Sequence, residues 1–238
     1  MKSYIKLVKR SAAAIGIAAM LSLLSSCLKD NKSYYTPPPT ALVSFFQAST
    51  ALPALSVYFN NNQVNWNPVT YGSGLSYVRA YTGLRTFNFY TYSEMGLQFT
   101  DTATLKADTV YSMFLSGTSS KTDFVLLKDH ISAPAAGMAS IRFVDLSPDA
   151  PAVDLVLADT IRVANKTYKG FSEFVPVSGD KVYNLQVRQA GTNTVLATLN
   201  NVSLNKNYVY TIMLTGLASG TVASNNQLAV YYVNNAFY

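Results

Sequence analysis

Reactive side chains are scarce in this chain, which has one cysteine, one histidine and 12 acidic residues among 238. A single cysteine excludes an internal disulfide and a Cys-x-x-Cys site. The histidine, His130, lies in a predicted linker beside Asp129, away from the reactive neighbours that hydrolytic triads and zinc sites require. The two glutamates, Glu94 and Glu173, stand in unrelated positions and suggest no catalytic pair. We therefore expect no enzyme, no catalytic residue and no cofactor.

Charge is also scarce, since 13% of the residues are charged, and the net charge of +6 is partly located at the N-terminus. Without residues 1–26 and their four basic side chains, 14 basic residues face 12 acidic ones, which leaves +2. A chain so close to neutral has no basic stripe for nucleic acid. We expect no nucleic-acid partner.

The N-terminus has the three parts of a secretory signal peptide. Basic residues precede a short apolar segment at 12–24, and small residues follow, as in leaders whose apolar region spans roughly 7–15 residues. The ending Leu24-Ser25-Ser26-Cys27 resembles the lipobox of bacterial lipoproteins. That resemblance implies that Cys27 is acylated and becomes the first mature residue, and stable anchoring by lipid requires two signals such as dual acylation. The alternative is an ordinary signal peptide that leaves a free thiol.

The rest of the sequence favours an all-β protein. Aromatic and β-branched residues, which suit a half-buried sheet, are abundant, and after residue 27 no segment shows the i, i+3, i+4, i+7 spacing of an amphipathic helix. Residues 27–40, with three consecutive prolines, are interpreted as the acylated cysteine and a flexible tether, extending up to ~40 Å at ~3.1 Å per residue.

Two segments occur twice. Residues 41–59 align without a gap on 139–157, and residues 105–117 align on 204–216, with offsets of 98 and 99. We therefore predict two tandem domains, the first over 41–129 and the second over 138–238, joined by a linker at 130–137. Domains of about 100 residues with alternating apolar positions suit an immunoglobulin-like β-sandwich of about seven strands.

Each copy also contains a candidate tyrosine corner. The segment Leu105-x-Ala107-x-Thr109-x-Tyr111 resembles that feature of Greek-key sandwiches, and the second copy keeps Leu204 and Tyr210. In the motif the tyrosine hydroxyl bonds to the backbone a few residues upstream. Tyr111 and Tyr210 are thus interpreted as fold-determining residues, with a ligand role as the minor alternative.

The sharpest motif is Ser147-Pro148-Asp149-Ala150-Pro151-Ala152-Val153-Asp154, preceded by Arg142. It resembles the opening of the family known as domain of unknown function 4397, with closer agreement over 139–233 than over 41–128. The resemblance implies a secreted, often tandem, immunoglobulin-like module and no established activity. The first copy departs from the pattern at 49–53, and the second has no histidine before Ser147.

The SPDAP segment itself has the composition of a turn. Proline fixes φ, serine and aspartate bond to nearby backbone groups, and Pro151 prevents strand continuation, which makes it a further fold-determining residue. The carboxylates Asp145, Asp149, Asp154 and Asp159 suggest a weak calcium site, but their spacing is not that of an EF-hand loop. Solvated turn residues are the favoured interpretation.

The single tryptophan, Trp66, stands among amides, with Asn65 and Asn67 beside it and Tyr71 after it. An exposed indole flanked by amides suits a sugar, because the ring stacks on an apolar sugar face while the amides meet hydroxyl groups. The favoured interpretation is nevertheless an aromatic ring that folds over the edge of a sheet, since tryptophan has a large apolar area.

These observations lead to two functional hypotheses. The first is a lipid-anchored, non-catalytic binding or adhesion module of the cell envelope, at the outer membrane, whose partner is a glycan or an envelope or matrix protein. The second is a structural envelope or pilus-like subunit that adds a strand to a neighbour. The weakly charged, aromatic segment 228–233 near the C-terminus supports the second hypothesis.

Overall fold

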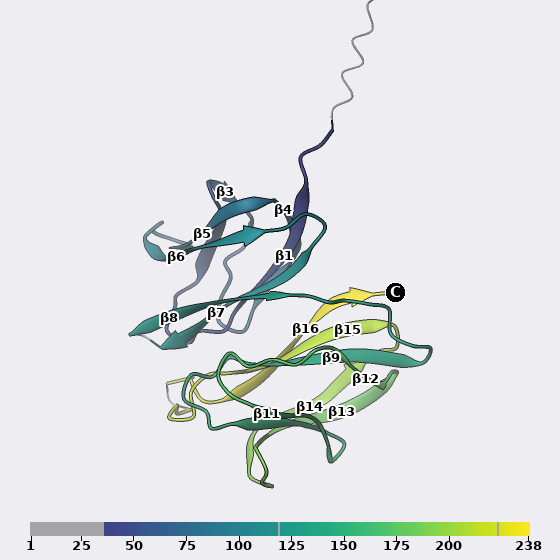
Figure 1. The fold of residues 1–238 in the computed structure, drawn as a ribbon. Helices are drawn as coiled ribbons and strands as arrows, with labels where there is room; N and C mark the ends of the chain where they lie inside the picture. Colours follow the sequence, from purple (N-terminus) through teal and green to yellow (C-terminus); the bar gives the residue numbers. More distant parts are fainter. Residues whose placement is uncertain (1–35, 119, 223) are drawn as a thin grey trace, which may run out of the picture. The chain divides into compact units, whose positions relative to one another are not determined.

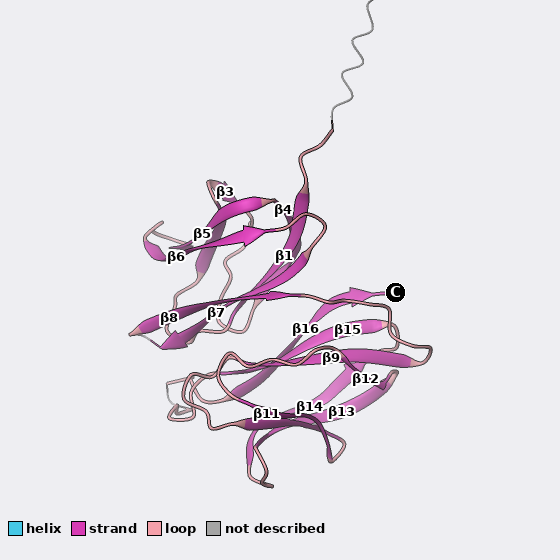
Figure 2. Ribbon diagram, viewed as in Figure 1, coloured by secondary structure: helices cyan, strands magenta, loops and turns pink. Residues whose placement is uncertain are grey.

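The computed structural model describes residues 36–118, 120–222 and 224–238 (Figure 1). The predicted signal peptide and Cys27 lie outside these residues. Every regular element in the described part is a β-strand (Figure 2), which confirms the all-β prediction. No helix among the described residues has the length and apolar character needed to cross a membrane.

Residues 40–128 form two four-stranded sheets that we call the first sandwich. One sheet has the strand order β4-β1-β7-β8 and the other has the order β3-β2-β5-β6. The strands are β1 (Thr40–Gln47), β2 (Leu55–Phe59), β3 (Asn62–Gln63), β4 (Gly74–Tyr81), β5 (Gly83–Thr91), β6 (Leu97–Leu105), β7 (Val110–Thr118) and β8 (Lys121–Lys128).

Residues 138–237 form a second sandwich with the same order, β12-β9-β15-β16 and β11-β10-β13-β14. Its strands are β9 (Met138–Asp145), β10 (Val153–Leu157), β11 (Thr160–Lys166), β12 (Val175–Ser178), β13 (Lys181–Gln189), β14 (Val195–Leu204), β15 (Tyr208–Thr215) and β16 (Ala229–Phe237).

The two sheet pairs agree with the prediction of two sandwiches, and the strand arrangement refines it. Immunoglobulin constant domains have about seven strands in sheets A-B-E-D and C-F-G. Here each sandwich has eight strands, and its first strand lies in parallel against its seventh. Each sandwich therefore has the order 4-1-7-8 in one sheet and 3-2-5-6 in the other.

The repeated sequence segments are neighbours in space. Val43 on β1 pairs with Tyr111 on β7, and Ile141 on β9 pairs with Tyr210 on β15. The two repeated segments, with offsets of 98 and 99, therefore correspond to the two central strands of the equivalent sheet in each sandwich.

Each sandwich has its own core. In the first, aromatic rings interlock between the sheets, with 5.1 Å between the ring centroids of Phe45 and Phe89 and between those of Phe59 and Phe87. The second core is mostly aliphatic, with residues such as Ile141, Leu155 and Leu185 fully buried.

A third apolar cluster joins the two sandwiches. Alternate residues of β1 serve different faces: Val43 and Phe45 enter the first core, whereas Phe46 joins a cluster with residues of the second sandwich, such as Val144 and Met213. Because both faces of these central sheets are covered, β7 and β15 are buried along almost their whole length. Residues 39–238 accordingly form one compact unit.

Both sandwiches contain the hydrogen bond that the tyrosine-corner motif predicts. The Tyr111 hydroxyl accepts the N–H of Lys106 at 3.1 Å, and the Tyr210 hydroxyl accepts the N–H of Asn205 at 3.1 Å. The two tyrosines are largely buried. They fix the turn that precedes β7 and β15.

We expect Tyr111→Phe and Tyr210→Phe each to lower the free energy of unfolding by about 1 kcal/mol, because each leaves a backbone N–H without its acceptor. Urea denaturation measures the change. Tyr208→Phe is the matched control, since the Tyr208 hydroxyl bonds to no other described residue. Unchanged midpoints in both variants would contradict a structural role for these hydroxyls.

Candidate functional site

The segment that holds Trp66 is fixed along β2. The Val64 N–H donates to the Val57 carbonyl at 2.9 Å, and the Leu55 N–H donates to the Val69 carbonyl at 2.8 Å. Asn65 lies between these contacts and is buried. Its Oδ1 accepts the N–H of Val57 at 2.7 Å, while its Nδ2 donates to the carbonyls of Leu55 and Asn67 at 3.0 and 2.8 Å.

Trp66 projects from this fixed segment. Its side chain is 96% exposed, and its carbonyl accepts the Tyr92 hydroxyl at 3.0 Å. The backbone is thus held on both sides of an indole that remains in solvent. This placement fits an exposed platform and corrects the favoured sequence interpretation of a ring folded over the sheet edge.

Three tyrosines lie close to this segment. Tyr90 on β5 pairs with Ser56 on β2, and its ring meets that of Tyr58 edge to face at 5.3 Å. Tyr92 follows β5 and, through its hydroxyl, reaches the Trp66 carbonyl. We call Tyr58, Trp66, Tyr90 and Tyr92 the aromatic face.

Polar side chains accompany the aromatic face. The Tyr58 hydroxyl donates to Gln63 Oε1 at 3.1 Å, and Thr100 Oγ1 donates to Asn88 Oδ1 at 2.7 Å. Asn88 pairs with Tyr58, which places both side chains on the same side of the sheet. Rings with nearby amides and hydroxyls suit a ligand that has both apolar patches and hydroxyl groups.

Two of the four predicted ligand residues do not belong to this surface. Asn65 is buried and its amide is used by the backbone, which corrects its assignment as a ligand residue. Tyr71 turns to the second sandwich, where its hydroxyl lies 2.8 Å from Thr215 Oγ1 and its ring meets Tyr231. Burial raises the pKa of Tyr71. Asn67 is exposed beside Trp66.

The equivalent surface of the second sandwich has a different composition. In β10 and β13, Asp154 pairs with Arg188, where the first sandwich has Ser56 and Tyr90. Arg188 donates to Gln186 Oε1 at 2.6 Å and to Asp159 Oδ1 at 3.1 Å. The aromatic face is therefore a feature of the first copy alone.

Two of the four candidate calcium ligands, Asp149 and Asp154, serve separate backbone contacts. Asp149 accepts the N–H groups of Ala218 and Ser219 at 2.6 and 3.0 Å, and these bonds help to lower its pKa. Asp154 accepts the N–H groups of Asn165 and Gly191 at 2.7 and 3.1 Å. No group of three potential metal ligands occurs among the described residues. Asp149 and Asp154 therefore stabilise loops, and Asp149 bonds to a loop that is far from its own turn in the sequence.

Asp145 has an unusual environment. It is fully buried, and its Oδ1 accepts the N–H of Ser147 at 3.0 Å, whereas Oδ2 has no partner among the described residues. Burial raises the pKa of Asp145 to about 7. At the equivalent position the first copy has Gln47, whose Nε2 is likewise unpartnered among the described residues.

A buried ion pair links the two sandwiches. Arg142 on β9 is 2% exposed, and its Nη1 donates to Asp129 Oδ1 at 2.6 Å. Nη2 donates to Ser112 on β7 at 3.0 Å and to Thr211 on β15 at 2.9 Å. The guanidinium also lies 4.7 Å from the centre of the Phe174 ring.

The second carboxylate oxygen of Asp129 completes this network. Asp129 Oδ2 accepts the hydroxyls of Tyr77 at 2.5 Å and Ser112 at 2.8 Å. Burial and the Asp129 charge raise the pKa of Tyr77 to about 12. From the sequence, Asp129 was interpreted only as a neighbour of His130. The available signal was an arginine inside the otherwise apolar strand Ile141–Val144.

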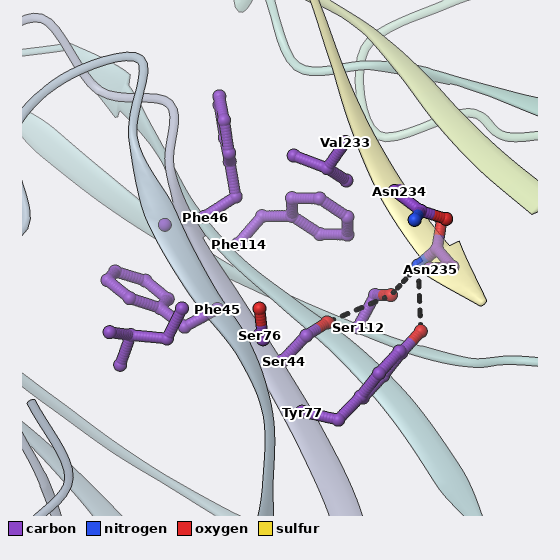
Figure 3. Close-up of a pocket in the computed structure, with 12 residues that line it drawn as sticks. Ser44, Phe45, Phe46, Ser76, Tyr77, Ser112, Phe114, Val233, Asn234 and Asn235 are labelled. Atoms are coloured by element: carbon purple, nitrogen blue, oxygen red, sulfur yellow. Dashed lines mark hydrogen bonds between the residues drawn. The ribbon is translucent and has the colours of Figure 1, made fainter. Parts of the chain in front are cut away.

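A cleft of about 290 Å³ lies beside this network, between β1, β4 and β7 of the first sandwich and β16 of the second (Figure 3). Phe46 and Phe114 form part of its wall. Dashed lines in Figure 3 connect Ser44, Ser112, Asn235 and Tyr77 at its other end. This cleft could not be predicted from the sequence, because its walls are far apart in the chain.

His130, which the sequence placed in a linker beside Asp129, is a neighbour of Glu173 in the structure. His130 Nδ1 lies 3.2 Å from Glu173 Oε2, and both side chains are more than half exposed. They form a surface contact between the linker and the segment before β12.

Comparisons with known proteins found a family model that matches part of the chain and distant likenesses to several solved structures. A search of the curated proteins found no match. One similar structure is the crystal structure of CBMbc (family CBM26) from Eubacterium rectale Amy13K in complex with maltoheptaose. Its sequence is 12% identical to this chain, the alignment covers 83% of this chain and 97% of that chain, and the TM-score is 0.25. That score is too low to support an argument.

The family match is more informative. The model of the domain of unknown function DUF4397 matches residues 41–156, which is the first sandwich together with β9 and β10 of the second. The SPDAPAVD motif predicts the closer agreement over 139–233, whereas the family match covers the first copy and ends just after this motif. The chain therefore carries a DUF4397-like domain.

Proposed function

We propose that this protein is a non-catalytic binding module of the cell envelope whose aromatic face recognises a neutral polysaccharide. The observation that carries the proposal is the 96% exposure of Trp66 on a backbone fixed by Asn65 and Tyr92. Covering a large indole removes apolar area from water, which contributes to the affinity for a ligand that stacks on it. The tyrosines and amides around it supply further stacking and hydrogen-bonding groups.

The aromatic face carries no charged residue among its four members, which favours a neutral ligand. Its rings come from a loop and two paired strands, so that their spacing is set by the sheet. A ligand with several similar units can meet the indole and the tyrosine pair together. A polysaccharide has this repeating character, and its sugar rings offer apolar faces beside hydroxyl groups.

We expect Trp66→Ala to weaken binding to an immobilised neutral polysaccharide about 30-fold, because central aromatic anchors contribute about 2 kcal/mol or more. Binding is measured on a glycan array and then by calorimetry with the retained glycan. Phe237→Ala is the matched control, since Phe237 is 71% exposed in the second sandwich. Equal binding by Trp66→Ala and the original protein would contradict the assignment of this site.

The anchor is part of the same proposal. Acylated Cys27 would tether the module to the outer membrane, and the proline-rich segment would hold it away from the surface. We expect Cys27→Ser to move the protein from the membrane fraction to the soluble fraction. Retention of Cys27→Ser on membranes would contradict lipid anchoring through this residue.

A structural subunit is the second candidate, and one observation favours it. β16 is an edge strand of the sheet β12-β9-β15-β16, and the chain ends in exposed Phe237 and Tyr238. An open edge can pair with a strand of a neighbour. Concentration-dependent assembly that a proline at Asn234 abolishes would support this candidate over the polysaccharide-binding module.

A further inference from the structure

A polar groove of about 440 Å³ lies in the second sandwich, where β10 ends. Its lining comes from the end of β10, the start of β11 and the first half of β13, with Ser178 of β12. The volume falls within the range of small-molecule sites, about 300–1,000 Å³. The groove therefore has room for one ring with a substituent.

In the first sandwich, the equivalent place is closed by Asn60, which follows β2. The Asn60 N–H donates to the Thr86 carbonyl at 2.7 Å, and Asn60 Oδ1 accepts the Thr86 N–H at 2.9 Å. Asn88 Nδ2 also donates to the Asn60 carbonyl at 3.1 Å. One asparagine thus satisfies the main chain of β5 beyond the end of β2.

The second sandwich lacks this closure. Ala158 follows β10 as Asn60 follows β2, and Asn184 on β13 corresponds to Thr86. Alanine has no side-chain acceptor, and no hydrogen bond joins the main chains of Ala158 and Asn184. Asn184 is also paired with no residue of β10 or β14. Its main-chain N–H and carbonyl therefore lack the partner that Asn60 gives to Thr86.

Two cations line the groove without partners. Arg162 and Lys181 are exposed, and neither forms an ion pair or a side-chain hydrogen bond with another described residue. Asp159, the acidic residue of the lining, lies 3.1 Å from Arg188 Nη2 and is thereby compensated. The groove has an excess of positive charge, which favours an anionic ligand.

Two amide groups add hydrogen-bond donors to the lining. Asn184 Oδ1 accepts the N–H of Asn201 at 3.1 Å, and Gln186 Oε1 accepts Arg188 Nη2 at 2.6 Å. The Nδ2 of Asn184 and the Nε2 of Gln186 bond to no other described residue. Such donors suit the hydroxyl oxygens of a sugar.

We propose that this groove binds an acidic sugar, which is a hydroxylated ring that bears a carboxylate or a phosphate group. Arg162 and Lys181 would hold the acidic group through charge-assisted hydrogen bonds. The main-chain N–H of Asn184 and the two amides would meet the remaining oxygens. The groove is larger than a bare anion requires, and the site does not rest on the aromatic face.

The test is an NMR titration of the full chain with glucuronate, galacturonate and glucose 6-phosphate. Methyl glucoside is the neutral counterpart, and acetate is the counterpart without a ring. We expect at least one acidic sugar to shift the amide resonances of Arg162, Lys181 and Asn184 saturably, at least about tenfold more tightly than methyl glucoside or acetate. Binding of a uronate identifies the acidic group as a carboxylate, and binding of glucose 6-phosphate identifies it as a phosphate.

The variant Ala158→Asn restores the closure of the first copy. It should occupy the Asn184 N–H and weaken binding of the acidic sugar about tenfold. The fold should tolerate it, because Ala158 and Asn60 have φ values of 47° and 53°, a conformation that asparagine adopts more readily than alanine. A midpoint of urea unfolding no lower than that of the original protein checks this.

The double variant Arg162→Ala, Lys181→Ala should likewise weaken binding at least about tenfold, since it removes both charged donors. The matched control is Arg79→Ala, Lys106→Ala, which removes one exposed arginine and one exposed lysine from the first sandwich.

Trp66→Ala should leave this titration unchanged, so that failure of the aromatic face and failure of the groove are distinguishable. The proposal is overturned if no acidic sugar binds saturably, or if methyl glucoside or acetate binds as tightly. It is also overturned if Ala158→Asn or the double variant at Arg162 and Lys181 keeps the original affinity.

Discussion

Replacing Arg142 by alanine is expected to lower the free energy of unfolding by about 3–5 kcal/mol, because removal of one partner leaves the other charge buried and unpaired. Asp129 is the orphaned group, and it is 6% exposed. The same variant also removes the donors to Ser112 and Thr211. Urea denaturation, followed by fluorescence and circular dichroism, measures the loss.

The matched control removes both charges. In the double variant Arg142→Met, Asp129→Leu no charge is left unpaired, and we expect it to recover most of the stability lost by Arg142→Ala. Arg188→Ala serves as a surface comparison, because its partner Asp159 is 92% exposed. A loss for Arg142→Ala no greater than that for Arg188→Ala would show that the buried pair does not hold the sandwiches together.

Asp145→Asn is expected to stabilise the protein at pH 8 by up to about 4 kcal/mol, which is the free energy that corresponds to a pKa moved from 3.8 to about 7. The folded state keeps the Asp145 proton up to about pH 7, whereas the unfolded state releases it near pH 4. The unfolded state thus binds fewer protons between these values, and stability falls as pH rises. The amide has no proton to release and avoids this loss.

The pH profile is the decisive measurement. Below pH 4 the original protein and Asp145→Asn should be nearly equal in stability, and the difference should grow to its full size above pH 7. Asn Oδ1 can still accept the Ser147 N–H, and the amide of Gln47 at the equivalent position of the first copy is a natural precedent. A stability difference that does not change with pH would show that Asp145 does not titrate in this range.

The sequence predicted the fold well where the signal was local or repeated. The offset of 98 between residues 41 and 139 identified two β-units, and both tyrosine corners make the hydrogen bond expected from five-residue spacing. For Trp66 the favoured interpretation, a ring folded over the edge of a sheet, was wrong, because the polar residues around it supply no apolar cover.

The sequence was less informative about contacts between distant segments. Asn65 and Asn67 have equivalent positions beside Trp66 in the sequence, yet only Asn65 is buried. Segment 64–69 lies against β2, and the Asn65 amide bonds to the backbone groups of Val57 and Leu55 there. Tyr71 was assigned to the same surface, but its ring meets Tyr231, far away in the chain. No periodicity or spacing encodes these pairings.

The packing of one sandwich against the other could not be predicted from the sequence for a similar reason. Alternation shows which residues of β1 lie on one face, but not that the other face is covered by a second sandwich. The sequence alone does not show whether Phe46 and Phe114 are exposed or buried. Their burial depends on Val144 and Met213 of the second sandwich, which belong to the same apolar cluster. Arg142 and Asp129 belong to the same interface, and neither has a local partner that would have indicated the ion pair.

The joint between the sandwiches has a consequence for the order of folding. Synthesis completes residues 40–128 before any strand of the second sandwich exists, and the first sandwich needs only its own residues to pair β1 with β7. Until residues 138–237 follow, Phe46, Phe114, Val125 and Leu127 stay uncovered, and Asp129 has no guanidinium. The half-made protein thus presents an apolar surface of the kind that chaperones bind and that drives aggregation. A chain that stops at the linker would be prone to aggregation, although its own sandwich is complete.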